Sequence, residues 1–233
     1  MDSLCDDFAM DDVAALERDR DRLSRSSTAE RVADILRERI AEGFFTPGQR
    51  LSEEAIGTAL GVSRNTLREA FRLLGHEGLL RHQLNRGVFV RVLSLEDVTD
   101  LYRVRRVIEC SAVRRATPDA LGPLREAVED GERAAAENRW RDVGTANLRF
   151  HQGITRLNGS QRLDDLMRQL LAELRLVFHV MRNPRSFHEP FVARNRELLE
   201  LMAAGELDKA ERELAAYFDD AEALLVEAYR PAP

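Results

Sequence analysis

The stretch Gly61–Gly75, GVSRNTLREAFRLLG, sets three arginines at helical spacing directly behind a glycine-containing turn. Arg64, Arg68 and Arg72 stand at i, i+4 and i+8, so they share one face of a helix. The opposite face has the spacing of a stripe that faces a core: Leu67, Ala70, Phe71 and Leu74. Ser63 precedes the helix and can cap its N-terminus through its hydroxyl. The basic face is therefore available to a partner outside the protein.

The same turn joins this basic helix to a shorter helix before it. Ser52 begins the shorter helix, two glutamates occupy its first turn, and Gly61 ends it. A further helix is predicted over residues 28–42, ahead of a break at Pro47–Gly48. Two short helices joined by such a turn make a helix-turn-helix.

The sequence pattern changes from helical to alternating after Gly78. Residues 79–84 and 87–92 predict two short strands, and Asn85–Arg86–Gly87 between them is a hairpin turn. A helix-turn-helix followed by a hairpin is a winged helix, and the ordered set of elements is more specific than any one of them. We therefore predict a winged-helix DNA-binding domain over residues 27–93.

Strand signals disappear after Ser94, and amphipathic helical patterns continue toward the C-terminus. Helices are expected at 95–116, 118–137, 140–157, 160–182, 189–204 and 206–229. Six such helices with short connections predict an all-helical antiparallel bundle over residues 94–233. Residues 1–26 mix Asp and Arg without a lasting apolar stripe, which indicates a flexible charged tail. The expected fold class is mainly α, with three helices and a small hairpin followed by the bundle.

The charge of the chain is unevenly distributed. The net charge is −6, yet residues 27–93 hold 10 Arg against 8 Asp or Glu. The basic excess therefore lies in the segment with the arginine stripe. No apolar run approaches the roughly 20 residues of a membrane-spanning helix, and the acidic N-terminus does not look like a secretion signal. Cys5 and Cys110 are too few for a disulfide framework, so a cytoplasmic protein without a membrane partner is expected.

The predicted recognition helix has base-reading side chains in its leading turn. A helix fits the major groove of DNA, and its N-terminal residues reach the base edges. The leading turn holds Arg64, Asn65, Thr66 and Arg68. Arg bonds guanine and Asn bonds adenine in bidentate fashion, each worth about 1–3 kcal/mol of discrimination. The hydroxyls of Ser63 and Thr66 suit phosphate oxygens, Arg50 can reach the DNA backbone, and Arg86 beside Gly87 can enter the minor groove.

An arginine stripe on a helix is more often a solvated face than a binding surface. Here the stripe starts at the helix N-terminus, behind a helix-turn-helix turn and ahead of a wing, and this context favours DNA. Arg72, two turns into the helix, is expected to be a surface or phosphate-facing residue.

Residues 28–93 resemble the winged helix of the GntR family. The resemblance is densest in FFTPGQRLSEEAIGTALGVSRNTLREAFRLLGHEGLLRHQLNRGVFV. The helical remainder, opening with LSLEDVTDLYRVRRVIECSAVRRA, resembles the FCD effector domain of the FadR-like subfamily. The resemblance implies a homodimeric, metabolite-responsive transcription factor, usually a repressor, that binds a palindromic DNA operator. It also implies that Arg64, Asn65, Thr66 and Arg68 read the groove and that Gly87 is the wing glycine. Glu54 stands where one relative has an Arg, so that contact is not carried over.

The resemblance also implies a site in the helical domain. Many FCD domains bind a divalent metal through an Asp and three His, the first two spaced D-x-x-x-H on one helix face. The matching positions are Asn147, His151, Asn195 and Tyr217, so His151 is the only family ligand that is retained. Asn and a neutral phenol are poor ligands for zinc-like ions. We therefore expect no metal or other cofactor, and a pocket that binds a small effector. Arg105 matches a cavity-facing Arg of the family and, with His151, would bind a carboxylate.

Two alternatives remain open for these side chains. A divalent metal held by His151 with His179 or His188 is the first. The second is that Asn147, His151, Asn195 and Tyr217 form a buried polar cluster whose hydrogen bonds are all made within the protein.

The whole chain has three candidate functions. The first is a DNA-binding repressor whose affinity for its operator is modulated by a small metabolite, a carboxylate. The second is an effector-independent, permanently active DNA-binding dimer whose bundle serves only for assembly. The third, an enzyme, has no supporting Ser/His/Asp set, nucleotide loop or metal-ligand motif, so we do not expect catalysis.

Overall fold

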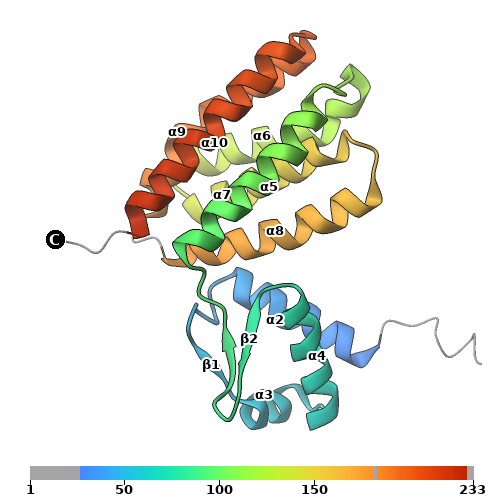
Figure 1. Cartoon of the computed structure of the whole chain (residues 1–233), viewed down its shortest axis with the longest axis vertical. Coiled ribbons are helices and arrows are strands. Elements are labelled where there is room, and N and C mark those ends of the chain that lie inside the picture. The colour runs from blue at the N-terminus through green and yellow to red at the C-terminus, as the bar shows by residue number, and fades with distance from the viewer. Residues whose placement is uncertain (1–26, 181–182, 230–233) are drawn as a thin grey trace, which may run out of the picture.

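The computed structural model describes residues 27–180 and 183–229, so the predicted tail over residues 1–26 lies outside it. A small mixed unit carries the N-terminal elements, and a bundle of helices stacks on it (Figure 1). The N-terminal elements are α2 (Thr28–Ala41), β1 (Arg50–Leu51), α3 (Glu53–Leu60), α4 (Arg64–His76), β2 (Leu80–Gln83) and β3 (Gly87–Val90). The predicted winged helix is confirmed.

The wing differs from the prediction by one short strand. Its sheet is antiparallel in the order β1-β3-β2, so the predicted hairpin gains a third strand on one edge. Arg50 pairs with Phe89 and Leu51 with Val88. A two-residue strand leaves no alternating pattern in the sequence, which is why β1 was not predicted.

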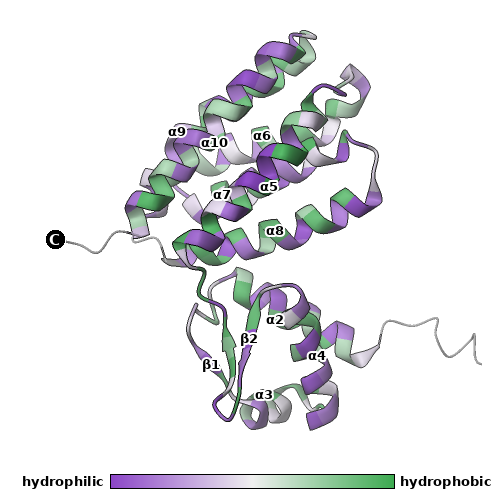
Figure 2. Ribbon diagram, viewed as in Figure 1, coloured by the Kyte–Doolittle hydropathy of each residue, from purple (hydrophilic) through white to green (hydrophobic). Residues whose placement is uncertain are grey.

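The predicted recognition helix, α4, packs as its sequence pattern indicates. Ser63 caps it, since its hydroxyl accepts a hydrogen bond from the Thr66 amide. The apolar face is at most 5% exposed at any position: Leu67, Ala70, Phe71 and Leu74. Burying each large apolar side chain contributes about 1.5–3 kcal/mol, so this stripe fixes the helix and leaves its basic face outward. Figure 2 shows hydrophilic residues along the visible side of α4.

The C-terminal region is all-helical, as predicted. Its elements are α5 (Leu95–Val113), η2 (Pro118–Leu121), α6 (Gly122–Ala136), α7 (Trp140–Arg156), α8 (Gln161–Val180), α9 (Pro184–Ala203) and α10 (Leu207–Tyr229). Ser94 and Asp97 close a capping box at the start of α5. No helix among the described residues is long and apolar enough to cross a membrane.

The start of α9 corrects the sequence analysis. A helix was predicted to begin at residue 189, but α9 begins at Pro184 and runs through Pro190. Pro184 occupies the first helical turn, where no amide hydrogen is required. The Asn183 side chain caps the helix by accepting from the amides of Arg185 and Ser186. The capped first turn offsets the single hydrogen bond that Pro190 removes.

Helix α8 connects the bundle to the winged helix. It lies directly over α2 (Figure 1). The carbonyl oxygen of Ala41, at the end of α2, accepts hydrogen bonds from Arg175 Nε at 3.1 Å and His179 Nε2 at 2.9 Å. Arg91, just after β3, binds Glu173 at 2.6 Å and Asp97 at 2.8 Å. These polar contacts attach the winged helix to the bundle at two places, the end of α2 and the residue just after β3.

Candidate nucleic-acid interface and buried polar cluster

The leading turn of α4 is exposed and partly unpartnered. The hydroxyls of Ser63 and Thr66 lie 2.8 Å apart and serve the helix cap. Arg64 and Asn65 are exposed, and their side chains form no hydrogen bond or ion pair with any described residue. Two side chains suited to base edges are thus free at the N-terminus of the helix.

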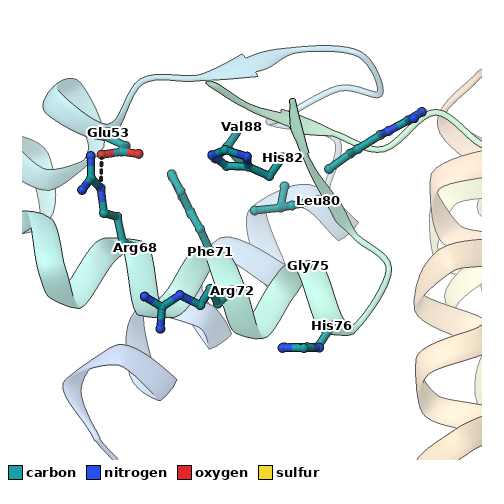
Figure 3. Close-up of a pocket in the computed structure, with 10 residues that line it drawn as sticks. Glu53, Arg68, Phe71, Arg72, Gly75, His76, Leu80, His82 and Val88 are labelled. Carbon is teal, nitrogen blue, oxygen red and sulfur yellow. Dashed lines mark hydrogen bonds and ion pairs between the residues drawn. The ribbon is translucent and has the colours of Figure 1, made fainter. Parts of the chain in front are cut away.

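Arg68 is held by the preceding helix. Its Nε donates to Glu53 Oε2 at 2.9 Å, from α4 to the first turn of α3 (Figure 3). The guanidinium is exposed, and its two terminal nitrogens have no partner among the residues that the structure describes. Glu53 therefore orients Arg68 without using the pair of donors that a guanine edge requires.

A basic groove runs between α4 and the wing. Its volume is about 760 Å³, and its lining combines both elements: Glu53, Arg68, Phe71, Arg72, Gly75, His76, Leu80, Arg81, His82 and Val88. Figure 3 shows Phe71 and Leu80 within it, with Arg72 and His76 along α4 and His82 on β2. Arg81 and His82 were not predicted as site residues from the sequence. Their exposed positions on the strand that follows the recognition helix were the available signal.

The wing tip brings two further arginines together. Asn85 and Gly87 have positive φ angles of 58° and 106°, which the tight turn requires. Arg86 is exposed at the tip. Arg50 from β1 lies against Gly87, where an added Cβ would be 3.1 Å from Arg50 Nε. The structure therefore places Arg50 at the wing.

The polar residues predicted in the helical domain meet at one buried place. Asn195 Nδ2 donates to Asn147 Oδ1 at 2.7 Å, and the Tyr217 hydroxyl donates to the same oxygen at 2.8 Å. His151 Nε2 lies 3.3 Å from the Tyr217 hydroxyl. All four side chains are at most 8% exposed. We refer to these four residues together with Arg105 and Glu109 as the polar cluster.

Glu109 is the member that the sequence analysis missed. Its two carboxylate oxygens bind Arg105 Nε at 3.0 Å and His151 Nδ1 at 2.6 Å, and it is fully buried. Burial lowers the pKa of His151, and the Glu109 charge opposes that shift only in part. A carboxylate oxygen only accepts, so the contact with Glu109 favours a proton on His151 Nδ1. Arg105 and His151 were expected to bind the carboxylate of an effector. In the structure both already bind the carboxylate of Glu109.

The polar cluster does not fit a metal ion. Within the described residues, no group of three or more His, Cys, Asp or Glu side chains is placed to hold one. Burial raises the pKa of Tyr217, which keeps the phenol protonated and a weak ligand. His188 and His179 do not join His151: His188 packs between Phe178 and Phe187, and His179 binds Ala41.

Buried polar atoms without partners lie in and beside the cluster. Arg105 Nη2, Asn195 Oδ1 and His188 Nδ1 make no hydrogen bond with any described atom. A cavity of about 10 Å³ is lined by Asn147, Asn195 and His188 among others. That space suits roughly one water molecule. Unsatisfied buried polar groups are rare enough in proteins to require a partner such as water or a ligand.

Fold and site together define a winged-helix protein with an exposed basic recognition face and an all-helical C-terminal domain. Residues 28–90 match the family of bacterial regulatory proteins of the gntR type, and residues 100–220 match the FCD domain. The chain belongs to the GntR family of transcriptional regulators, in its FadR-like branch with an FCD domain.

Named relatives and a solved structure agree with this assignment. The Nta operon transcriptional regulator of Aminobacter aminovorans is 35% identical over 139 residues, covering 56% of this chain and 64% of that protein. The repressor RspR of Escherichia coli (strain K12) is 26% identical over 190 residues, covering 80% and 83%. A GntR regulator from Rhodococcus sp. RHA1 has a structure with TM-score 0.84 at 47% identity, covering 88% of this chain and all of that one. This chain thus spans just under two thirds of the Nta regulator.

Proposed function

We propose that this protein is a sequence-specific DNA-binding regulator, acting as a repressor and binding a palindromic operator as a homodimer. The exposed leading turn of α4 carries the proposal, because its Arg64 and Asn65 are free and Arg68, in the same turn, lines the basic groove beside the wing. Single winged helices bind half-sites weakly, and a two-fold symmetric dimer matches a palindrome.

Each DNA contact has a distinct role in this proposal. Arg64, Asn65 and Arg68 read base edges, with Arg68 oriented by Glu53. Ser63 and Thr66 share one hydrogen bond, which leaves a hydroxyl proton to donate to a phosphate. Other backbone and minor-groove contacts come from the wing and β1: Arg50, Arg86 and Gly87.

The second part of the proposal is control by a small carboxylate bound in the helical domain. Its contacts would be Arg105, Asn147, His151, Asn195 and Tyr217. The unsatisfied Arg105 Nη2 and Asn195 Oδ1 support this, since they are a donor and an acceptor that a bound molecule would satisfy. A carboxylate would replace Glu109 as the partner of Arg105 and His151, which requires side chains to move because the cavity holds only about 10 Å³.

An effector-independent regulator is the second candidate. The observation that favours it is the closed polar cluster, in which Glu109 already neutralises Arg105 and bonds His151. On this alternative the cluster stabilises the bundle and the dimer binds its operator regardless of metabolites.

The DNA-binding proposal is tested by selecting duplexes from a random pool and measuring affinity for the enriched site by fluorescence anisotropy. A selected operator should bind at least about 10³-fold more tightly than scrambled DNA at the same salt concentration. Equal affinity for both would remove sequence-specific binding.

Thermal melting with a panel of small carboxylates then separates the two candidates for control. A stabilising carboxylate that also changes operator affinity supports an effector-modulated repressor. An unresponsive protein that still binds its operator supports the permanently active dimer.

A further inference from the structure

A second polar pocket lies at the junction between the bundle and the winged helix. It forms where the starts of α7 and α9 meet the end of α8. Its volume is about 80 Å³, and its lining is mainly basic and aromatic: Arg141, Arg175, Phe178, His179, Pro184 and His188. We call it the junction pocket. No acidic side chain lines it.

Both arginines of the junction pocket have unused donors. Arg141 is exposed, and its side chain forms no ion pair or hydrogen bond with any residue that the structure describes. Arg175 uses Nε on Ala41 O and Nη2 on Thr145 Oγ1 at 2.8 Å, which leaves Nη1 without an acceptor in the described chain. Asp142, which follows Arg141, is paired with Arg139, and its charge also attracts Arg175 from outside the pocket lining. The lining itself has two positive charges and no carboxylate.

His188 supplies an independent sign of a missing ligand. The side chain is only 3% exposed, and its Nδ1 has no hydrogen-bond partner among the described atoms. His188 lines both the junction pocket and the small cavity beside the polar cluster. Gly144 gives the ring its space, because an added Cβ would lie 2.8 Å from His188 Nε2. A polar ring is thus kept in a tight aromatic site with one nitrogen unsatisfied.

We propose that the junction pocket binds a small oxyanion, a carboxylate or a phosphate group, between Arg141 and Arg175. Guanidinium groups bind such oxygens through charge-assisted hydrogen bonds, which are stronger than neutral ones. A space of about 80 Å³ admits the oxyanion group itself and little more. His188 completes the site by bonding an anion oxygen or a bridging water.

Occupation of the junction pocket would reach the DNA-binding unit directly. Arg175 and His179 both donate to Ala41 O, the last carbonyl of α2, and both line the pocket. An oxyanion bound to the free Nη1 of Arg175 draws the guanidinium toward the pocket and so weakens its Nε bond to this carbonyl. Binding would therefore release the end of α2 and loosen the connection between winged helix and bundle. Only this coupling step rests on the proposed function, because through it anion binding would change the affinity of the protein for its operator.

Trp140 makes the anion site measurable without DNA. It is the only Trp in the chain, it precedes Arg141, and the Arg185 guanidinium lies 5.3 Å from its ring. The full-length protein is titrated with inorganic phosphate, and separately with acetate, while chloride is withdrawn to keep the ionic strength constant. We expect a saturable change in Trp140 fluorescence with at least one anion. The anion that saturates identifies a phosphate or a carboxylate site.

Variants decide whether the signal comes from the pocket. Arg141→Ala should raise the anion concentration for half-saturation at least tenfold, and His188→Gln should weaken binding less. Arg125→Ala is the matched control, since Arg125 is also exposed and unpaired on a bundle helix; it should leave the titration unchanged. A linear response with both anions, or one unaffected by Arg141→Ala, would overturn the site.

Hydrogen exchange tests the coupling. With saturating anion, the amides of Gly43 and Phe44, which bond to Ile40 and Arg39 at the end of α2, should exchange several-fold faster. Anion binding without faster exchange would overturn the coupling. If the protein binds the anion saturably but binds no DNA, the anion site is upheld and the proposed function is rejected. Failure of the anion site can therefore be distinguished from failure of the proposed function.

Discussion

Arg68 shows how one carboxylate can prepare a base-reading side chain. Glu53 holds Nε and leaves the two terminal nitrogens free, but its negative charge also lies in the groove expected to face DNA. The contact therefore orients Arg68, but the negative charge of Glu53 weakens the attraction of the groove for DNA phosphates. Glu54, the next residue, is exposed and makes no side-chain bond within the described structure.

Replacing Glu53 should lower specificity while strengthening non-specific binding. Glu53→Gln removes the ion pair and a negative charge, so affinity for scrambled DNA should rise and the ratio of operator to scrambled affinity should fall about three- to fivefold, the scale of an exposed ion pair. Glu54→Gln, measured by the same anisotropy assay, should raise non-specific affinity and keep the ratio. An equal loss of specificity in both variants would contradict the orienting role of Glu53.

His188 should make stability depend on pH. Burial, with a contribution from the Arg175 charge, lowers the pKa of His188 to about 4 from 6.5. The unfolded state therefore binds more protons between these values, so the contribution of neutral His188 is complete above pH 6.5 and is lost as the pH falls toward 4. The free energy of unfolding of wild type relative to His188→Gln should fall by up to about 3 kcal/mol between pH 7.5 and 4. Denaturant titrations that give a pH-independent difference would show that His188 is not buried as a neutral ring.

At the residue scale the resemblance to the FCD domain indicated the polar residues but not all of their partners. It gave Asn147, His151, Asn195 and Tyr217, and the structure brings these four side chains together. Glu109 was missed because an i, i+4 Arg–Glu pair on a helix usually lies on a solvated surface. Its burial depends on α7 and α10 packing over α5, which local sequence does not encode.

At the scale of elements, the wing depends on Gly87. Its φ of 106° is unfavourable for any residue with a side chain, and a Cβ there would press on Arg50. The wing glycine therefore supports both the turn and the position of an arginine proposed to contact DNA.

Gly87→Ala should cost about 1–2 kcal/mol of stability and also weaken operator binding at least fivefold, by displacing Arg50 and Arg86. Gly159→Ala is a matched control, since Gly159 also has a positive φ but open space around it, far from the wing in sequence. Gly159→Ala should lose about as much stability as Gly87→Ala, measured by denaturant unfolding, and its operator affinity should be unchanged. Full operator affinity in Gly87→Ala would exclude the wing from the DNA contact.

Helices with a strong apolar periodicity could be predicted from the sequence, whereas elements that depend on tertiary contacts could not. The caps and apolar stripes of α4 and α5 mark their starts in the sequence, and both helices form there. The predicted start of α9 was wrong, because the Asn183 cap that stabilises the helix lies seven residues before Pro190. Strand β1 exists only through pairing with β3.

At the scale of the whole molecule, a monomer does not explain recognition of a palindrome. The protein is proposed to be a homodimer assembled through its helical domain. Light scattering during size-exclusion chromatography should therefore give twice the 26.5 kDa chain mass at micromolar concentration. A monomer under these conditions, together with full operator affinity, would contradict a preassembled dimer.

The central proposal is that the leading turn of α4 reads bases, whereas Arg72, expected to be a surface or phosphate-facing residue, reads none. The most direct test measures operator and scrambled-DNA affinity against salt concentration for wild type, Asn65→Ala and Arg72→Ala. Asn65→Ala should weaken operator binding by about 1–3 kcal/mol and leave the scrambled affinity and salt slope unchanged. Arg72→Ala should weaken both DNAs alike and reduce the salt slope by about one unit. Unchanged specificity in Asn65→Ala would contradict base reading by this turn.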